Sequence, residues 1–405
     1  MAGKNYIVLG AGQQGLAAAY DLALNGDAAR ITLADASLPV ARVAAQRIKK
    51  LLISRGARAP RLSIIPVDGR RESDLYKRIR GHDGVLNALP YFLNVAVARA
   101  AIAARAHYVD LGGHFETTQE ILRLDRPAQK MGVALAPDCG LAPGLCNSLA
   151  ALGVQRLENI SEVRMLGGVL PGYPIPPLGY KKASSLEGVL ANYDGTAHVL
   201  KNGQVTQIQG FSEKEDIAFD APLGTLEAFV TGGATSTAPW TYEGRVRSYS
   251  YKTLRYPGHF DKIMLLKQLG LLDDKPVMVD GQAVVPQRLF LALAQTTLAH
   301  PDVRSLVVLR VIVRGEQVGQ KVEMIYDLLE YDDPRTGFSA LQRTAGFSAA
   351  IALEMLVTGA VRAQGIAPLE RAFPPLPYLD AIQRRGLRIR ETGPLPCTPK
   401  PGFAE

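Results

Sequence analysis

The segment GAGQQG, near the start of the chain, has the G-x-G-x-x-G spacing of dinucleotide-binding turns. In that spacing Gly10 allows a tight turn, Gly12 lets the backbone approach a pyrophosphate, and Gly15 lets a helix pack closely on a strand. The helix that would start at Gln13 and Gln14 offers free N–H groups and the positive end of its dipole to the phosphates. The spacing therefore predicts a nucleotide site, with a glycine turn that binds no ligand as the alternative.

An aspartate stands where the ribose of such a nucleotide would bind. Asp35 follows Gly15 by twenty residues and ends the β-rich run ITLAD. In dinucleotide-binding units an acidic residue at this position bonds the adenosine ribose hydroxyls and repels a 2′-phosphate, which favours NAD over NADP. Arg42, a turn into the next predicted helix, keeps NADP open as an alternative. We therefore expect NAD as the cofactor.

Residues at the ends of the later predicted strands should belong to the same site, because ligands of open α/β sheets bind at the carboxyl ends of the strands. Asp68 ends the third strand and is expected on the adenine side, with a solvated strand-end aspartate as an equal alternative. The other expected cofactor contacts follow the fourth and fifth strands: Asn87, Ala88, Leu89, Pro90, Leu111 and Gly112.

The reacting end of the site is expected where VDLGGH and PDCG follow two further strands. Asp110 is a candidate general base or a partner for a substrate ammonium, although an aspartate at a strand end is also a common helix cap. His114 is a second candidate base, or a residue that only precedes a helix.

Two of the chain's three cysteines lie in the stretch PDCGLAPGLCN. A redox pair is disfavoured, because Cys146 falls inside the helix predicted to start near Pro143 and Gly144, whereas Cys139 precedes the turn. We expect Cys139 to line the cleft as a substrate contact and Cys146 to be a small buried apolar residue. Six scattered histidines do not supply the clustered ligands of a zinc site, so no metal is expected.

The elements that must position these residues alternate between short β-rich runs and amphipathic helical stretches over residues 1–140. Nearly continuous apolar strands between helices predict an α/β fold with a doubly wound parallel sheet, the Rossmann dinucleotide-binding domain. The predicted strands are 6–10, 31–35, 62–67, 84–89, 108–111 and 133–137, and the predicted helices are 13–25, 38–53, 71–79, 91–105 and 116–130.

A second α+β domain, built on a mixed or antiparallel sheet, is expected over residues 141–335. Asn202-Gly203 between two alternating runs indicates a hairpin with a type I′ turn. The other predicted elements are a strand at 245–256, a hairpin of 306–313 with 320–331, and helices at 259–269 and 286–299.

The end of the chain divides into two parts. The apolar helix predicted at 342–359, within residues 336–365, must dock on another surface, and the first domain is the expected one. Residues 366–405 contain three clustered prolines and are expected to form a C-terminal extension that follows the surface.

The amino-acid composition argues against two classes of partner, nucleic acids and membranes. The net charge of +8 comes from 46 basic and 38 acidic residues without a basic run, so a nucleic-acid partner is not expected. The longest apolar stretch, 345–361, is interrupted by Glu354 and shorter than the ~20 residues of a membrane span, so we expect a buried helix and no membrane partner. With few cysteines and a strand-like run close to the N-terminus, a cytoplasmic protein is expected.

Several motifs, taken in order, resemble the saccharopine dehydrogenase-like family: VDLGG, DCGLAPG, GGVLP, PLGYK, PLGTLEAFVTGGATST and YKTLRYPGH. The likeness covers about residues 5–360 and is closest to the family's NAD-dependent lysine 6-dehydrogenase branch. It implies a second domain that also mediates dimerisation, and hence a homodimer or a higher homo-oligomer. It also implies oxidative deamination of the ε-amino group of L-lysine to allysine, which cyclises to 1-piperideine-6-carboxylate, with release of ammonia and NADH.

The family motifs carry the expected contacts to the α-amino-acid end of the substrate. Arg255, in LRYPGH, is the candidate clamp for the α-carboxylate because its planar fork binds carboxylates bidentately. Lys181, in PLGYK, is a second candidate for that carboxylate, whereas Lys182 beside it is expected to face solvent. Glu187 is the candidate acceptor for the α-ammonium.

Three further motif residues are expected at the reacting end. His259 is a candidate base or substrate contact, with helix capping as the alternative. Thr235 and Ser236 offer hydroxyls to the substrate, unless the GGATST turn is purely structural.

Two other functions remain as alternatives. Members of the same family catalyse a saccharopine-type, opine-forming reductive condensation of an amine with a keto acid using NAD(P)H. The acidic Asp35 disfavours NADP, and Glu187 stands where saccharopine-forming relatives tend to have a basic residue for a second dicarboxylate. The other alternative is a regulator that binds NAD without turnover.

Overall fold

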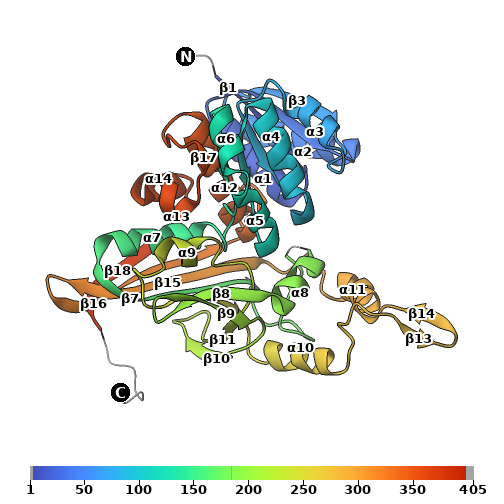
Figure 1. Ribbon diagram of the computed structural model, residues 1–405. Coiled ribbons are helices and arrows are strands. Elements are labelled where there is room, and N and C mark those ends of the chain that lie inside the picture. Colours follow the sequence, from blue (N-terminus) through green and yellow to red (C-terminus); the bar gives the residue numbers. More distant parts are fainter. Residues whose placement is uncertain (1–2, 184, 398–405) are drawn as a thin grey trace.

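The computed structural model describes residues 3–183 and 185–397, which form two large β-sheets with helices packed between and around them (Figure 1). The first is a parallel sheet in the order β17-β6-β5-β4-β1-β2-β3, with the doubly wound arrangement predicted for residues 1–140. Its strands are β1 (Lys4–Leu9), β2 (Ala28–Asp35), β3 (Arg61–Pro66), β4 (Gly84–Asn87), β5 (His107–Asp110), β6 (Ala134–Ala136) and β17 (Gly365–Ile366).

Apolar residues on both faces of each strand explain why this sheet is covered on both sides. Along β1, Tyr6 and Val8 pack in one core cluster, whereas Ile7 and Leu9 pack in another on the opposite face. All four side chains are fully buried, as the period of two along a strand requires when helices cover each face. The covering helices are α1 (Gln13–Asn25), α2 (Leu38–Ser54), α3 (Glu72–Ile79), α4 (Asn94–Ala104), α5 (Phe115–Leu122) and α6 (Asp125–Met131).

The helix predicted at 116–130 is divided into α5 and α6. Pro127 lies in the first turn of α6, where a residue without an N–H group is tolerated, whereas in a continuous helix it would remove a hydrogen bond. The proline therefore ends one helix and begins the next.

The second sheet is mixed and contains nine strands, in the order β10-β11-β12-β7-β15-β16-β18, with β8 paired to β12 and β9 paired to β8. The pairing is antiparallel except between β7 and β12. Its strands are β7 (Glu158–Pro171), β8 (Thr196–Lys201), β9 (Gln204–Gln209), β10 (Glu215–Ala218), β11 (Thr225–Val230), β12 (Tyr249–Arg255), β15 (Ser305–Gln317), β16 (Gln320–Tyr331) and β18 (Ile389–Pro396).

Both predicted hairpins of this sheet are confirmed. Asn202 and Gly203 join β8 to β9 with φ of 53° and 80°, the two positive values that a type I′ turn requires. β15 and β16 pair along their whole length. The helices of this domain are α7 (Leu145–Arg156), α8 (Leu186–Asp194), α9 (Ala238–Tyr242), α10 (His259–Gln268) and α11 (Pro286–Thr297), and a small hairpin, β13 (Val277–Val279) with β14 (Gln282–Val284), projects beside α11 (Figure 1).

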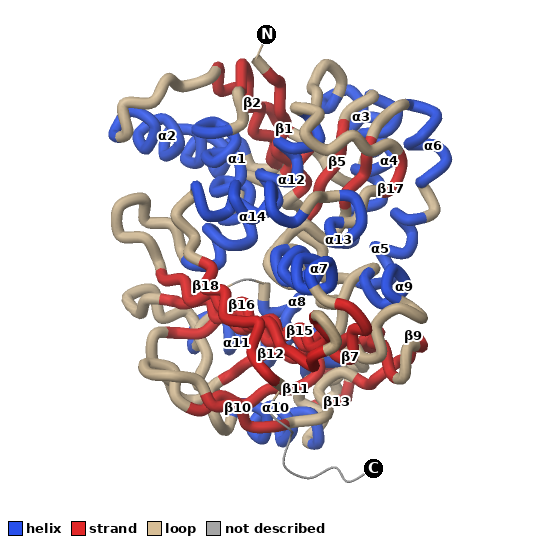
Figure 2. The backbone as a smooth tube through the Cα atoms, turned by 90° about the vertical axis from the view of Figure 1, so that its left-hand side faces the viewer, coloured by secondary structure: helices blue, strands red, loops and turns tan. Residues whose placement is uncertain are grey.

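The last part of the chain returns to the first domain and then to the second. A π turn at Gln342–Gly346 leads into α12 (Phe347–Val357), which packs against α1, as expected for the apolar helix. The chain then adds β17 to the edge of the first sheet, forms α13 (Leu369–Ala372) and α14 (Pro375–Arg384), and adds β18 to the second sheet. Figure 2 shows α7, α13 and α14 between the two sheets.

The described part of residues 366–405 is therefore not the surface-following extension that was predicted. Tyr378 and Ile382, one turn apart on α14, are fully buried. The prolines that suggested irregular structure stand at the start of α14, where their fixed φ and missing N–H group suit the first helical turn. Residues 398–405 lie outside the described part of the chain.

A buried ion triad fixes α14 to the first domain. The Arg385 guanidinium lies 3.0 Å from the Asp21 carboxylate of α1 and also pairs with Glu354 of α12. Burial raises the pKa of Asp21 to about 6, and the nearby Arg385 opposes that rise. The triad therefore depends on Arg385, because a buried carboxylate without its cation is strongly unfavourable.

Replacing Arg385 with Ala should lower the free energy of unfolding by about 3–5 kcal/mol, measured by urea denaturation, because Asp21 would be left buried without its cation. The folded-state pKa of Asp21 should rise further, so the deficit should grow as the pH increases above 6. The exposed neighbour supplies the control: Arg384→Ala should change stability by no more than about 0.5 kcal/mol. Equal effects of the two substitutions would contradict this role of Arg385.

Candidate functional site

The glycine-rich loop between β1 and α1 is shaped as its sequence predicts. Gly10 has φ of +88°, and a Cβ there would lie 2.7 Å from the carbonyl oxygen of Ala88. At Gly15 a Cβ would lie 1.8 Å from the carbonyl oxygen of Gly10. Gly12 differs, because a Cβ there would have no atom within 4 Å. The space above Gly12, at the N-terminus of α1, is thus an open cradle that suits a pyrophosphate.

Asp35, at the end of β2, holds this loop by its carboxylate. One oxygen accepts a hydrogen bond from the Ala11 N–H group and the other from the Ser37 N–H group, each at 2.8 Å. Because each carboxylate oxygen has a second lone pair, both can still accept a ribose hydroxyl. The residues present therefore fit a dinucleotide, with Asp35 at the ribose and Gly12 at the phosphates.

The turn after β4 is held by the side chain of Asn87. Its carbonyl oxygen accepts from the Leu89 N–H group at 3.2 Å, and its amide donates to the Asn94 side chain at 2.8 Å. Asn87 is therefore a buried support for the turn, while Ala88 is half-buried and lines a cavity between the two domains. Pro90 precedes a short 3₁₀ turn at Tyr91–Leu93 rather than α4 itself.

Asp68 and Gly112, two other expected cofactor residues, have different surroundings. The Asp68 carboxylate accepts from the Arg70 N–H group at 3.1 Å and lies 3.4 Å from the Arg71 guanidinium, so it stabilises its own turn. Gly112 follows β5 with φ of +71°, and its Cβ would lie 2.2 Å from a carboxylate oxygen of Asp138. Only glycine fits at this close approach.

A cavity of about 500 Å³ lies between the two domains, directly in front of the glycine-rich loop. The first domain contributes Gly12, Gln13, Gln14, Ala88 and Leu111 to its walls, and the second contributes Lys182, Ala183, Ser185, Glu187 and Gln295. We call this cavity the interdomain cleft. It brings together predicted nucleotide contacts and the predicted ammonium acceptor Glu187.

The second domain presents opposite charges to the cleft. Glu187 lies in the first turn of α8 and accepts from the Ser185 hydroxyl at 2.8 Å. Hydrogen bonds from its own N–H group and from Ser185 hold the pKa of Glu187 below its usual value, so it stays ionised. Lys182 lines the same wall and donates to the Gln295 side chain. A carboxylate and an ammonium thus face the nucleotide loop together.

Lys182, rather than Lys181, is the lysine of the cleft. The Lys181 ammonium donates to the Val303 carbonyl oxygen and does not line the cavity. Lys181 was expected to bind the substrate and Lys182 to face solvent, and the structure places the two lysines the other way round. Adjacent residues in an extended segment point to opposite sides, and the sequence PLGYKK gives no sign of which lysine faces inward.

Two buried carboxylates meet where β5 and β6 end. Asp110 is 1% exposed and accepts from the Gly112 and Asp138 N–H groups at 2.8 and 2.9 Å and from the Tyr108 hydroxyl at 2.7 Å. Burial raises the pKa of Asp110, while these three donors stabilise its ionised form. Its neighbour Leu111 lines the cleft.

Asp138 completes the pair and connects the two domains. Its carboxylate accepts from the Thr118 hydroxyl of α5 at 3.0 Å and from the Ser236 hydroxyl of the second domain at 2.6 Å. Burial and then the charge of Asp110 raise the pKa of Asp138 to about 7. Asp138 was not among the predicted site residues, although it lies just after β6 much as Asp110 lies at the end of β5.

The cysteines of this region are buried and free. The Cys139 thiol is directed to the carbonyl oxygens of Ala136 and Pro137, and burial raises its pKa well above the usual value. Burial likewise raises the pKa of Cys146 to about 12. Neither side chain therefore forms a thiolate near neutral pH, and no disulfide joins them.

Arg255 and His259 lie together in an aromatic cluster, and neither lines the interdomain cleft. The Arg255 guanidinium donates to the Tyr193 hydroxyl at 3.1 Å and lies 5.1 Å from the centre of the Tyr180 ring. His259 contacts the same Tyr193 hydroxyl at 2.9 Å, and burial followed by the charge of Arg255 lowers its pKa to about 3. The geometry therefore supports neither a carboxylate clamp at Arg255 nor a base at His259.

The GGATST hydroxyls are also bound within the protein. Thr235 donates to the His198 carbonyl oxygen at 2.7 Å and Ser236 donates to Asp138. His114 caps α5 by accepting from the Thr117 N–H group and stacks on the Tyr91 ring, with centroids 4.3 Å apart. None of these three residues lines the interdomain cleft, and Ser236 is the one whose hydrogen bond joins the two domains.

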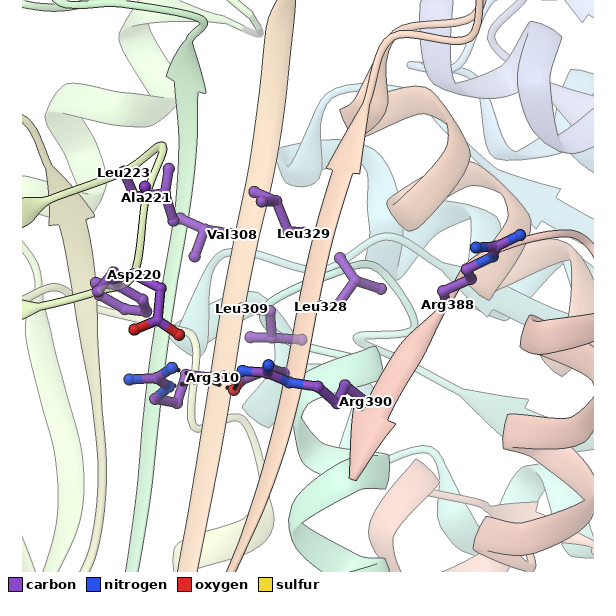
Figure 3. Close-up of a pocket in the computed structure, with 12 residues that line it drawn as sticks. Asp220, Ala221, Leu223, Val308, Leu309, Arg310, Leu328, Leu329, Arg388 and Arg390 are labelled. Carbon is purple, nitrogen blue, oxygen red and sulfur yellow. Dashed lines mark hydrogen bonds and ion pairs between the residues drawn. The ribbon is translucent and has the colours of Figure 1, made fainter. Parts of the chain in front are cut away.

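A second hollow, of about 350 Å³, opens on the second sheet and is shown in Figure 3. Its charged wall contains Arg310, which is paired with Asp327 at 2.6 Å, and the side chain of Arg390 on β18. Val308 and Arg310 point into it from the face of β15 opposite Leu309, which packs in the core shared with α7. None of the predicted site residues lines this hollow.

Within residues 3–183 and 185–397, no group of three His, Cys, Asp or Glu side chains is arranged to bind a metal ion. In the same residues, no helix has the length and apolar character needed to cross a membrane.

Comparison with known families identifies both domains. Residues 6–135 match the saccharopine dehydrogenase NADP binding domain, and residues 140–387 match the saccharopine dehydrogenase C-terminal domain. The fold is similar to that of apo saccharopine dehydrogenase (L-Glu forming) from Saccharomyces cerevisiae, with a TM-score of 0.76, 20% identity, and coverage of 96% of this chain and 99% of that one.

Two curated relatives are similar to this chain over part of their length. A saccharopine dehydrogenase [NADP(+), L-glutamate-forming] from Pyricularia oryzae is 27% identical over 228 residues, which are 52% of this chain and 48% of the relative. The mitochondrial alpha-aminoadipic semialdehyde synthase of Bos taurus is 24% identical over 394 residues, 79% of this chain and 41% of the relative. The chain thus spans less than half the length of these two relatives. The predicted family is confirmed, while the lysine 6-dehydrogenase branch stays a prediction.

The glycine-rich loop allows a test that separates binding from folding. Gly12→Ala should fold normally, because its Cβ enters open space, yet weaken nucleotide binding at least tenfold (about 1.4 kcal/mol), because that space is the phosphate cradle. Gly15→Ala should instead lower the melting temperature, because its Cβ would collide with Gly10. Titration calorimetry with NAD and NADP, together with thermal unfolding, measures both. Unchanged nucleotide affinity in Gly12→Ala would contradict the assignment of the cradle.

Proposed function

The chain belongs to the saccharopine dehydrogenase family, and from this we propose that it is a nicotinamide-dependent dehydrogenase acting at the ε-carbon–nitrogen bond of a lysine-type amino acid. The observation that carries the proposal is the interdomain cleft, where Lys182 and Glu187 face the nucleotide loop. An amino acid is a zwitterion at its α-carbon, and a neighbouring cation and carboxylate match its two charges.

The reaction is balanced in atoms and charges: a C–H and an N–H bond break in the oxidation, and the carbon–nitrogen bond breaks in the hydrolysis that follows. Oxidation removes a hydride from the ε-carbon and a proton from the nitrogen, which yields an imine. Water then hydrolyses the imine to a semialdehyde and the released amine. A bound oxidised nicotinamide supplies the hydride acceptor, and the released proton passes to solvent.

The protein's own groups have separate tasks in this proposal. Lys182 binds the substrate α-carboxylate and Glu187 binds the α-ammonium. Asp110, ionised and fixed by three donors, lies next to the cleft residue Leu111 and favours the positive charge that develops on the imine nitrogen. Cys139, buried and protonated, has no covalent role.

The first candidate substrate is saccharopine, a secondary amine that joins the ε-nitrogen of lysine to C2 of a glutarate. Support comes from the two matched domains and from relatives named as glutamate-forming saccharopine dehydrogenases. The released amine would then be glutamate. Lys182 is the lone basic side chain among the residues that line the described cleft, so a second cation for the glutarate carboxylates must come from elsewhere.

The second candidate is free L-lysine, whose oxidation at the same carbon releases ammonia. Glu187 favours it, because an ionised glutamate in the cleft attracts an ammonium and repels the carboxylates of a larger dicarboxylate substrate. The two candidates differ only in the group attached to the nitrogen, so the same cleft and the same bond are involved.

The deciding assay incubates the protein with NAD or NADP and with saccharopine or L-lysine at alkaline pH. Reduced nicotinamide is followed by absorbance, and glutamate or ammonia is then identified. Glutamate release supports the first candidate and ammonia release the second. Nucleotide binding without turnover of either substrate would favour the non-catalytic regulator and contradict the proposed function.

We propose NAD as the preferred cofactor, on the evidence of Asp35, although the family's domain is described as NADP binding. Asp35→Ser combined with Ala36→Arg should shift the ratio of kcat/KM values toward NADP by at least tenfold, because it removes the repulsion and adds a phosphate partner. Asp68→Ser is the matched control and should leave the ratio unchanged. An unchanged ratio in the double variant would contradict the role of Asp35.

The adjacent lysines give a matched pair for the substrate role. Lys182→Met should raise KM for the amino acid at least tenfold while the affinity for NAD changes little, because it removes the cation of the cleft. Lys181→Met should leave KM near its original value, because its ammonium bonds the Val303 carbonyl oxygen instead. Equal loss of NAD and substrate affinity in Lys182→Met would assign that lysine to the nucleotide.

A further inference from the structure

We propose that Asp138 is a positioning residue for the reaction: it carries the proton of the buried carboxylate pair, keeps Asp110 ionised, and joins the two domains through the same side chain. The proposal rests on the proposed function for its link to catalysis. Its structural basis does not require a substrate, and can be tested without one.

The Asp110–Asp138 pair is buried and forms no ion pair with a cation of the described chain. Asp110 and Asp138 are 1% and 4% exposed, and neither forms an ion pair with any Lys, Arg or His of the described chain. The other charged group that acts on Asp138 is Glu370 of α13, which is also acidic. Two carboxylates in such a place do not both ionise near neutral pH, and one of them retains a proton.

The hydrogen-bond partners of Asp110 and Asp138 determine which of the two carboxylates holds the proton. Asp110 accepts from two backbone N–H groups and from the Tyr108 hydroxyl. An N–H group is only a donor, so these bonds require an acceptor and favour the ionised form of Asp110. Within the described residues, Asp138 accepts only from the hydroxyls of Thr118 and Ser236. A hydroxyl can rotate and accept instead, so a protonated Asp138 keeps its partners.

The backbone is shaped to bring these groups together. Asp138 has φ of 63° and Ser236 has φ of 51°, both in the left-handed region that is uncommon for residues with a side chain. Gly112 makes room for the Asp138 carboxylate, which a Cβ would approach to 2.2 Å. Three unusual positions therefore converge on one side chain, in support of a role beyond capping a strand.

The consequence for the reaction is a fixed negative charge on one carboxylate at the edge of the cleft. Glu370 is held apart by the Thr237 and Thr241 hydroxyls, at 2.7 and 2.8 Å, and so does not replace Asp138 in the pair. Because Ser236 belongs to the second domain, loss of the proton from Asp138 would change the junction as well as the charge beside Asp110.

Thermal unfolding at different pH values tests the proton directly. The pKa of Asp138 rises from 3.8 in the unfolded chain to about 7 in the folded protein, so the folded state binds more protons between these values and loses stability as the pH rises through them. Asp138→Asn cannot ionise. Its melting temperature relative to the original protein should therefore increase by at least about 2 °C between pH 5 and pH 8.

Two further variants keep the test decisive. Ser236→Ala removes a donor that lowers the pKa of Asp138, so the loss of stability should move to higher pH, and this variant carries the test if Asp138→Asn does not fold. Asp280→Asn, at the exposed tip of the β13–β14 hairpin, is the control and should parallel the original protein. Parallel curves for Asp138→Asn, or an unshifted curve for Ser236→Ala, would overturn the proposal.

The pH profile of kcat/KM tests the link to catalysis. The original protein should show an ionisation near pH 7 that Asp138→Asn lacks, and a purely structural residue would lower kcat/KM without removing it. An ionisation that persists in Asp138→Asn would overturn the positioning role. Absence of turnover with every lysine-type substrate would instead count against the proposed function, and the unfolding curves would still decide where the proton lies.

Discussion

The two domains of this protein meet at a pair of buried carboxylates, Asp110 and Asp138, that form no ion pair with a cation of residues 3–183 and 185–397. Removal of Asp110 and Asp138 from water is unfavourable, and donors from several segments must converge to offset that cost. These donors come from β5, from α5 and from the second domain, so the electrostatic requirement of the pair fixes how the segments meet. The turns after β5 and β6 and the GGATST turn take their conformations from this constraint. Leu111, which directly follows Asp110, connects this network to the interdomain cleft.

The nucleotide half of the site could be predicted because its determinants are local. The glycines, the start of α1 and Asp35 lie within one strand–helix–strand unit, where spacing along the chain fixes position in space. On the wall that the second domain contributes to the cleft, Glu187 was among the predicted residues, whereas its neighbours there were not. Lys182, Ser185 and Gln295 reach the cleft from a loop, a helix cap and a distant helix, and their sequence neighbourhood carries no signal of that meeting.

The type of a residue is also a poor guide to its role when the side chain is buried away from the site. Arg255 and His259 have the chemistry of a clamp and a base, yet both are surrounded by tyrosine and phenylalanine rings of the second domain. The cluster of Pro374, Pro375 and Pro377 suggested a surface extension, but these prolines begin the buried helix α14. In both cases, the decisive information is which apolar side chains surround the residue, and that depends on contacts between segments far apart in sequence.

The two last strands of the described chain, β17 and β18, determine when each large sheet can be completed during synthesis. β17 forms one edge of the first sheet and β18 one edge of the second, and each is synthesised after every other strand of its sheet. During synthesis, each sheet must therefore wait with an unpaired edge, which is the part of a sheet most prone to pairing with other chains. Residues 365–397 therefore supply an outermost strand to both sheets. A nascent chain stalled before residue 365 would expose both edges at once.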